Sequence, residues 1–410
     1  MNCIAIIAEY NPFHTGHLYL IQTLRRQFGE DAAIIVMMSG SFVQRGEPAL
    51  FDKWTRAAWA LEGGADCVVE LPVLYALSSA EEFASGAVRL AARMGCTHLA
   101  CGVEHGSAAS FYELAAACSR ISNAFHADTT GITYGEYISQ QLEKELPAQT
   151  AALLRKPNAL LAAEYVKAMQ NYAPAMKFIP ILRQGMHDGP SLSGPFASAS
   201  AIRRTVQEGA VQAIEPYIPP YERSALQRLW RQRKYTDYSR YGDLVLYRSR
   251  LLSPSDLRSF PAFSEGLENR WHRILQQSST WPEALAALKT KRYAYSRLCR
   301  MGAYTVLSIR RADIEQAYEQ GPQYGRILAL SALGAAAVKK IKKEFPLVTK
   351  VAADGRRLSA FGQTMLHYDL VSTDIQAFCS HAPSDRRGQK DCYTSPYIAM
   401  NRSNACHTSL

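Results

Sequence analysis

The sequence predicts an α/β protein in which a Rossmann-like doubly wound parallel sheet is followed by a mainly α-helical domain. Its 410 residues begin with short, unbroken apolar runs such as residues 3–8 and 32–38, which are typical of strands buried on both faces. Segments with the apolar period of a helix separate these runs, and this alternation favours a parallel sheet. From residue 222 to about 345 the pattern is amphipathic and helical, with no clear strand.

The elements of the predicted sheet follow one another in a regular order. Asn11-Pro12 breaks the first apolar run, and Gly63-Gly64 ends the second predicted helix. Strands are expected at residues 3–8, 32–38, 67–72, 97–101 and 177–182. Helices are expected near residues 18–24 and at 51–62, 79–94, 134–145, 159–171 and 198–207.

A proline-rich stretch around residues 214–220 predicts a boundary between two domains. We expect the sheet domain at 1–212, a basic helical domain at 213–378 and an irregular tail at 379–410. Short alternating pieces predict a small strand-containing end at residues 347–376 of the helical domain. Its helices are expected at 222–233, 238–252, 263–277, 281–287 and 294–301.

Charge is distributed unevenly along the chain. Residues 1–200 carry 14 Lys and Arg against 18 Asp and Glu, whereas residues 201–410 carry 32 against 18. A second half with a balance of +14 indicates a polyanionic partner such as nucleic acid. Solvated helices can also be basic without a partner. Candidate RNA contacts are the basic stretches with nearby tyrosines at 228–235 and 289–293, and the lysine cluster at 339–343.

The composition argues against a membrane or secreted protein. No apolar run reaches 18 residues, and the N-terminus lacks the basic segment of a signal peptide. The nine cysteines are scattered and odd in number, with no C-x-x-C pair. This usage predicts reduced thiols and a cytoplasmic location.

The most informative residues are His14 and His17, which lie where the first strand ends and the first helix begins. In an open α/β sheet this is the edge at which ligands bind. A helix start offers free N–H groups to phosphate, and two imidazoles on one helical face can bind one anion together. Either histidine alone is equally compatible with a structural role. A zinc pair would want ligand-spaced cysteines, which are missing.

A second candidate motif comes at the start of the helix expected at 198–207. Ser198 and Ser200 could bind phosphate oxygens with the helix N-terminus, and Arg203 could bridge them. A serine N-cap is the simpler interpretation of the same pattern. No lysine loop of the KMSKS type follows, which argues against an aminoacyl-tRNA synthetase.

The stretch EYNPFHTGHLYL resembles the HxGH signature of a nucleotidyltransferase superfamily. Together with MSGSFVQRGEPAL (38–50), KWTRAAWALEGGADCVVELP (53–72) and FASASAIR (196–203), it resembles the bacterial tRNA(Met) cytidine acetate ligase family. The resemblance covers roughly residues 1 to 210 and is weaker beyond them. It implies that residues 1–212 bind ATP, that acetate is activated as acetyl-adenylate, and that the wobble cytidine of elongator tRNA(Met) becomes N4-acetylcytidine.

The resemblance also implies the site residues. The catalytic residues would be His14, His17 and Arg203. The ATP-binding residues would be Ile7, Ala8, Glu9, Tyr10, Asn11, Pro12, Phe13, His14, Thr15, Gly16, His17, Leu18, Tyr19, Leu20, Gly102, Asn158, Arg183, Ser198 and Ser200. Mg²⁺ would accompany ATP through its phosphates, with no metal site of the protein's own. No protein partner is implied.

Several alternatives stay open at the level of sequence. Arg45 could hold a small carboxylate or belong to a surface loop, and His187-Asp188 could be a general base or a turn. A small-molecule adenylyltransferase of cofactor synthesis would share both motifs, but it has less need of a basic second half. A non-catalytic tRNA-binding protein could keep the same fold.

Overall fold

The computed structural model describes residues 2–124, 134–151, 153, 157–183, 192, 196–290, 292–341 and 344–399. An eight-stranded sheet lies at its centre, in the order β10-β8-β5-β2-β1-β6-β7 with β9 beside β8. A separate hairpin consists of β3 (Phe42–Val43) and β4 (Glu47–Pro48). The strands of the sheet are β1 (Cys3–Ala8), β2 (Ala33–Ser39), β5 (Cys67–Leu71), β6 (His98–Val103), β7 (Lys177–Leu182), β8 (Gly325–Ser331), β9 (Leu347–Val348) and β10 (Tyr397–Ala399).

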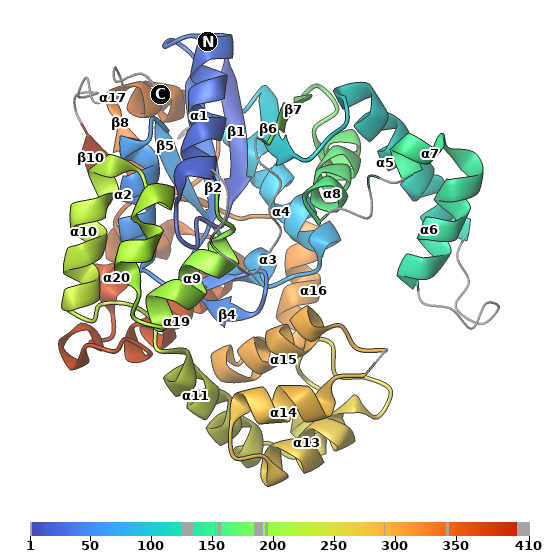
Figure 1. Cartoon of the computed structure of the whole chain (residues 1–410), viewed down its shortest axis with the longest axis vertical. Helices are drawn as coiled ribbons and strands as arrows, with labels where there is room; N and C mark the ends of the chain where they lie inside the picture. The colour runs from blue at the N-terminus through green and yellow to red at the C-terminus, as the bar shows by residue number, and fades with distance from the viewer. Residues whose placement is uncertain are drawn as a thin grey trace.

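The strand register explains why the runs at residues 3–8 and 32–38 are apolar throughout. β1 pairs in parallel with β2, with Cys3 opposite Ala33, and with β6 on its other side. Successive residues of β1 belong to two separate cores, Ala5 to one and Ile6 to the other. Helices therefore cover both faces of the sheet (Figure 1), and the predicted doubly wound α/β fold is confirmed.

The two cores contain different helices of the first half. The core that includes Ile6 is completed by α1, α2 and α9, whereas α4 and α8 pack together in the other core. Asp52 caps α2 and Ser79 caps α4, each by accepting a backbone N–H. The helices of this half are α1 (Thr15–Phe28), α2 (Lys53–Glu62), α3 (Val73–Ala76), α4 (Ala80–Arg93), α5 (Ala108–Ala124), α6 (Tyr134–Glu145), α7 (Ala148–Ala151), α8 (Pro157–Tyr172) and α9 (Ala199–Gln207).

A group of helices follows in the second half, as predicted. Trp271 and Trp281 meet in its interior with ring centroids 5.6 Å apart, and α11, α13, α14 and α15 lie together beneath the sheet in Figure 1. No helix in the described part of the chain is both long and apolar enough to cross a membrane. The helices of this part of the second half are α10 (Pro220–Arg231), α11 (Tyr238–Leu251), α12 (Pro254–Leu257), α13 (Leu267–Gln277), α14 (Trp281–Leu288), α15 (Tyr295–Leu307) and α16 (Arg311–Gln320).

The expectation that residues 222–345 contain no strand is wrong. β8 lies inside the central sheet, antiparallel to β5, and it is followed directly by α17 (Ala332–Ile341). The strand is rich in Leu and Ala and runs into an Ala-rich helix, so the composition of the whole segment resembles one helix. Pairing with β5 overrides that local preference.

The chain after residue 347 also differs from the prediction. Only β9 forms a strand in the segment expected to be strand-containing, where α18 (Val351–Asp354) and α19 (Ala360–Phe378) follow. The tail is not irregular throughout, because it forms α20 (Lys390–Tyr393) and β10, which pairs with β8. Strand β8 provides the partner that the tail's sequence does not reveal. The division of the chain at residues 212 and 378 stays a prediction.

Candidate active site

A buried arginine forms hydrogen bonds that fix the turn after β1. Arg56 of α2 donates hydrogen bonds to the carbonyl oxygens of Glu9 (2.6 Å), Ser39 (3.0 Å) and Phe51 (3.0 Å). Burial lowers the pKa of Arg56 to about 10, so the side chain still carries its charge at neutral pH. The ends of β1 and β2 are thereby fixed to each other and to α2.

His14 and His17 begin α1 and cap it reciprocally. His14 Nδ1 accepts the backbone N–H of Gly16 at 3.0 Å, and His17 Nδ1 accepts the backbone N–H of His14 at 3.3 Å. An imidazole nitrogen that accepts a hydrogen bond carries no proton, so each neutral ring must carry its proton on Nε2. The two rings lie with centroids 3.8 Å apart. The helix start therefore presents two Nε2–H donors side by side.

Both imidazoles are held in the neutral form. Burial, and to a lesser degree the charge of Arg183, lowers the pKa of His14 to about 3. Burial, His14 and Arg183 together hold the pKa of His17 well below its ordinary value. A neutral N–H donor that is already oriented can stabilise the negative charge that develops in a transition state without reorganising.

Gly16 is required by the position of the His14 ring. A Cβ at residue 16 would lie 2.9 Å from His14 Cε1 and 3.1 Å from its Nδ1, closer than side-chain atoms normally approach. The glycine between the two histidines therefore lets the imidazole fold back over the first turn of α1.

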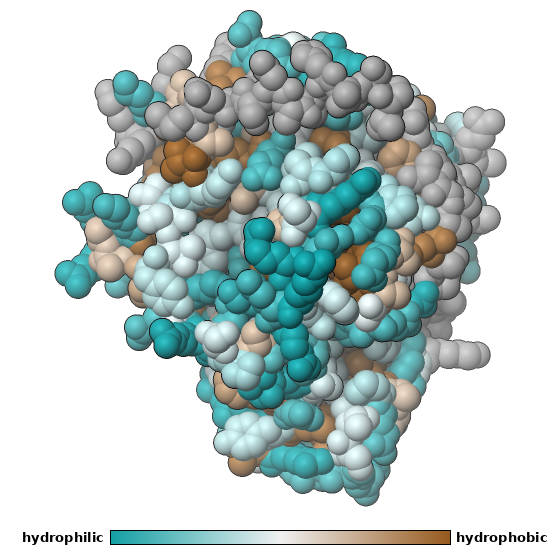
Figure 2. All heavy atoms as spheres, turned by 60° about the vertical axis from the view of Figure 1, so that its left-hand side comes forward, coloured by the Kyte–Doolittle hydropathy of each residue, from teal (hydrophilic) through white to brown (hydrophobic). Residues whose placement is uncertain are grey.

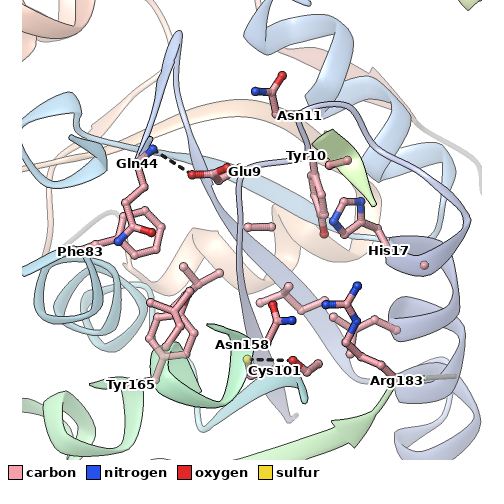
Figure 3. A pocket seen from close by; sticks show the side chains of 18 of the residues that line it. Glu9, Tyr10, Asn11, His17, Gln44, Phe83, Cys101, Asn158, Tyr165 and Arg183 are labelled. Atoms are coloured by element: carbon pink, nitrogen blue, oxygen red, sulfur yellow. Dashed lines mark hydrogen bonds between the residues drawn. The ribbon is translucent and has the colours of Figure 1, made fainter. Parts of the chain in front are cut away.

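The histidines line a cavity of about 680 Å³ at the carboxyl end of the parallel strands. Figure 3 shows His17 and Arg183 on one side of this cavity and Phe83 and Tyr165 on the other. Asn158 donates from Nδ2 to Glu104 Oε1 at 2.6 Å, which fixes its amide. A cavity of this size, lined by apolar side chains together with convergent polar and charged groups, is typical of a small-molecule site.

Gly102 leaves room beside Arg183. A Cβ at residue 102 would be 3.5 Å from Arg183 Cγ, which is ordinary contact, so the neighbouring protein atoms do not require glycine there. Any need for glycine at this position must come from a ligand.

The second motif lies at the start of α9, next to the first. Ser198 is the N-cap of α9 and accepts the N–H of Ala201 at 3.2 Å, as the simpler interpretation expected. Arg203 donates to the carbonyl oxygen of Asn11 at 2.8 Å and lies 3.3 Å from Glu47 Oε1. The Nη2 that faces Glu47 also donates to Ser200 Oγ at 3.4 Å. The two motifs are therefore joined directly through Arg203.

The cavity contains many of the predicted ATP-binding residues but not all of them. Its described lining includes Ile7, Ala8, Glu9, Tyr10, Asn11, His14, Gly16, His17, Tyr19, Leu20, Gly102, Asn158 and Arg183. The structure places outside this lining Pro12, Phe13, Thr15, Leu18, Ser198, Ser200 and Arg203. Phe13 is a core residue with no exposed surface. The roles of all these residues in binding and catalysis stay predictions.

Other cavity residues were missed, and all of them except Phe196, which opens the FASASAIR stretch, come from segments that carry no recognisable motif. They are Ser79, Ala80, Phe83, Leu160, Leu161, Tyr165, Phe196, Ser296 and Arg300. Arg56, which holds the turn, gave no signal either, since an arginine in an amphipathic helix usually lies on the surface. His187 and Asp188 lie outside the described residues, as do Lys291, Lys342 and Lys343.

The expected basic surface is present on α10. Arg228, Arg231 and Arg233 are exposed at or just after its C-terminal end. Figure 2, in which the side of the molecule with α10 comes forward, shows hydrophilic side chains gathered over the middle of this face. In the cluster near residue 290, by contrast, Lys289 donates to the carbonyl oxygen of Tyr293 at 2.9 Å.

The first strand of a mostly parallel sheet leads into a helix that begins with two histidines at the cavity, and an S-x-x-x-I-R helix starts beside it. This arrangement defines a nucleotidyltransferase of the HIGH class. The family model described as HIGH Nucleotidyl Transferase matches residues 1–391. A tRNA(Met) cytidine acetate ligase of Latilactobacillus sakei is 37% identical over 366 residues, covering 86% of this chain and 89% of the relative. One of Syntrophomonas wolfei is 34% identical, covering 97% and 99%.

Two solved structures have a fold similar to that of this chain over nearly its whole length. Thermotoga maritima TmcAL bound with alpha-thio ATP has a TM-score of 0.89 and 27% identity, covering 98% of this chain and 100% of that one. Its apo form I has a TM-score of 0.91 at the same identity and coverage. The chain belongs to the HIGH nucleotidyltransferase family and, within it, to the tRNA(Met) cytidine acetate ligases.

Proposed function

We propose that this protein is an ATP-dependent ligase that acetylates the wobble cytidine of elongator tRNA(Met). An acetate oxygen attacks the α-phosphorus of ATP, pyrophosphate leaves, and acetyl-adenylate forms. The N4 amine of the cytidine then attacks the acetyl carbonyl carbon, AMP leaves and the amine loses a proton. The product is N4-acetylcytidine.

The observation that carries the proposal is the reciprocal capping of His14 and His17 at the cavity. Transfer of an adenylyl group requires donors for the charge that develops on the α-phosphate and on pyrophosphate. The two neutral Nε2–H groups are suited to that role because the backbone N–H groups of α1 fix both rings. Arg183 adds a positive charge on the side of the cavity where His17 lies (Figure 3).

Arg203 supports the same step from the second motif. Its contacts with Asn11 and Glu47 hold the guanidinium beside the first motif. We infer that it stabilises departing pyrophosphate together with the N-terminal end of α9, from which Ala199 lines the cavity.

We also propose Mg²⁺ as the partner of ATP. In the described cavity lining Glu9 is the sole carboxylate, and its Oε1 accepts the N–H of Gln44 at 2.9 Å. This donor set fits a cation held mainly by the phosphates, as Mg²⁺ commonly is in nucleotide sites. The ion would offset phosphate charge while the histidines and arginines of this chain orient the reacting groups.

The tRNA partner is supported by the charge of the second half and the exposed arginines of α10. Because ATP and tRNA are both cytoplasmic in bacteria, we propose that the protein acts there.

Transfer of radiolabelled acetate to total tRNA, with and without ATP, tests the function. We expect ATP-dependent label in tRNA that is lost in His17→Ala, while the control His367→Ala, at an exposed position of helix α19 outside the cavity lining, retains it. Consumption of ATP with another acceptor would refute the tRNA substrate. No label and no ATP turnover would favour a binding protein that lacks catalysis.

A further inference from the structure

One wall of the cavity is built jointly by the β3–β4 hairpin and helix α15. Gly46 at the turn has φ +87, and a Cβ there would overlap the backbone of Cys299 and Arg300, so only glycine allows this approach. Tyr241 of α11 donates its hydroxyl to the Gly46 carbonyl at 3.1 Å. Arg300 Nη1 donates to the Gln44 carbonyl at 3.4 Å. The hairpin is therefore fixed against the helical part of the chain.

This wall carries two arginines that face the cavity. Arg45 is exposed at its edge and Arg300 is half-buried, and both line the cavity. Within the described ranges, no carboxylate lies within ion-pair distance of either guanidinium. Of the two nearby acids, Glu47 forms its ion pair with Arg203 and interacts with Arg45 only at longer range, and Glu9 accepts from Gln44. The wall thus has positive charge to offer a ligand.

The arginine wall lies away from the histidines. In Figure 3, Gln44 and Arg183 are on opposite sides of the cavity, and Arg300 is on the side of Gln44 because it donates to that carbonyl. Acetate has to reach the α-phosphate, which the proposed function places beside His14 and His17. The carboxylate of acetate therefore belongs with the histidines, and Arg45 and Arg300 are left for another anion.

Exposure at the edge decides which anion fits. Arg45 is reached from solvent while Arg300 lies deeper, so a ligand that contacts both must enter the cavity and also continue outside it. A free nucleotide would be enclosed, whereas a polynucleotide has phosphates on both sides of an inserted base. Guanidinium groups bind phosphate by charge-assisted hydrogen bonds.

We propose that Arg45 and Arg300 form a subsite for the RNA backbone phosphates that flank the acceptor cytidine. The inference rests on the proposed function and gives α15 and the hairpin a role in it. They place the RNA strand so that the base enters the cavity opposite the histidines, toward the acetyl-adenylate.

The double variant Arg45→Ala/Arg300→Ala tests the subsite. We expect tRNA binding to weaken about a hundredfold and the slope of log affinity against log salt to fall by about 1.4, as for two lost single-strand phosphate contacts. Arg45→Lys/Arg300→Lys, which keeps both charges, is expected to retain most of the salt slope. Arg26→Ala is the matched control, because Arg26 is exposed at the end of α1 that points away from the cavity.

Acetate-dependent ATP–pyrophosphate exchange, which needs no RNA, separates the explanations. We expect a much smaller change in exchange than in tRNA affinity. An unchanged tRNA affinity and salt slope would overturn the proposal, and so would a rise in the KM for acetate that exceeds the loss of tRNA binding. If the unmodified protein binds and acetylates no tRNA, the proposed function itself has failed.

Discussion

Substituting Gly16 by alanine should separate catalysis from folding at this site. The added Cβ would lie 2.9 Å from His14 Cε1, so the ring must rotate away. It then loses the 3.0 Å hydrogen bond from Gly16 N–H and its 3.8 Å stacking on His17. Losing the cap costs about 1 kcal/mol, but alanine gains about 0.5–1 kcal/mol over glycine within a helix. The net change in the free energy of unfolding should be within about 1 kcal/mol.

The effect on the reaction should be much larger. A displaced His14 no longer offers its Nε2–H in a fixed direction, and loss of one preorganised donor lowers kcat by about 10²–10³-fold. The assay is acetate-dependent ATP–pyrophosphate exchange, with thermal unfolding measured on the same preparation. Gly388→Ala is the control, because a Cβ there would make only ordinary contacts of 3.5 Å with Asp374. A kcat within twofold of the parent, or a fall in Tm above about 10 °C, would refute this reasoning.

Three further predictions concern stability, ligand fit and pH. Arg56→Leu leaves buried carbonyl oxygens without donors and should lower the free energy of urea unfolding by about 3–5 kcal/mol, against less than about 0.5 kcal/mol for the exposed Arg26→Leu. Gly102→Leu should raise the KM for ATP at least about tenfold at unchanged Tm, with Gly102→Ala much milder because its Cβ meets Arg183 at ordinary distance. The pKa of His14 is about 3 in the folded protein, whereas an imidazole in the unfolded chain takes up a proton as the pH falls below about 6.5. Acid therefore favours the unfolded chain, and His14 should lower the free energy of unfolding by about 2 kcal/mol at pH 5 relative to pH 8. His14→Gln should flatten that slope in urea unfolding, and an unchanged slope would contradict the neutral ring.

The elements predicted well from sequence are those whose burial is written locally. Residues 3–8 are apolar throughout, and residues 67–72 are apolar except for Glu70, because both faces of these strands are covered; they form β1 and β5. The histidine pair could be placed at a ligand-binding edge because a strand, a turn and a helix follow one another within the first segment. Such information lies within about 20 residues and needs no tertiary structure.

The parts that sequence could not supply depend on distant partners. The sequence of β8 is typical of a helix, and it forms a strand because it pairs with β5. The tail forms β10 because β8 offers it a strand to pair with. Arg56 becomes a core residue only through the carbonyl oxygens at the ends of β1 and β2. Arg300 reaches the cavity because Gly46 lets the hairpin approach α15. Each of these depends on a contact between segments that the sequence pattern does not relate.

A further long-range dependency links the end of the chain to the cavity. Lys53 lies 2.8 Å from Glu70 and 2.9 Å from Asp391, and Arg326 of β8 lies 3.5 Å from Glu70, all with side chains at most 3% exposed. Breaking such a buried set by removing one partner typically costs about 3–5 kcal/mol, because a charge is left uncompensated. Glu70 in turn packs against Gly40, where a Cβ would overlap its carboxylate.

Gly40 begins the loop that leads into the β3–β4 hairpin. In this hairpin Gln44 donates its backbone N–H to Glu9, and Glu47 forms an ion pair with Arg203. A carboxylate inside the sheet would therefore disturb this loop unless Lys53, and Arg326 from β8, neutralised it. The segments after residue 320 thus complete the sheet and also fix the wall of the cavity opposite the histidines. For this reason the geometry of the candidate site is a property of the whole chain, although its recognisable motifs lie in the first half.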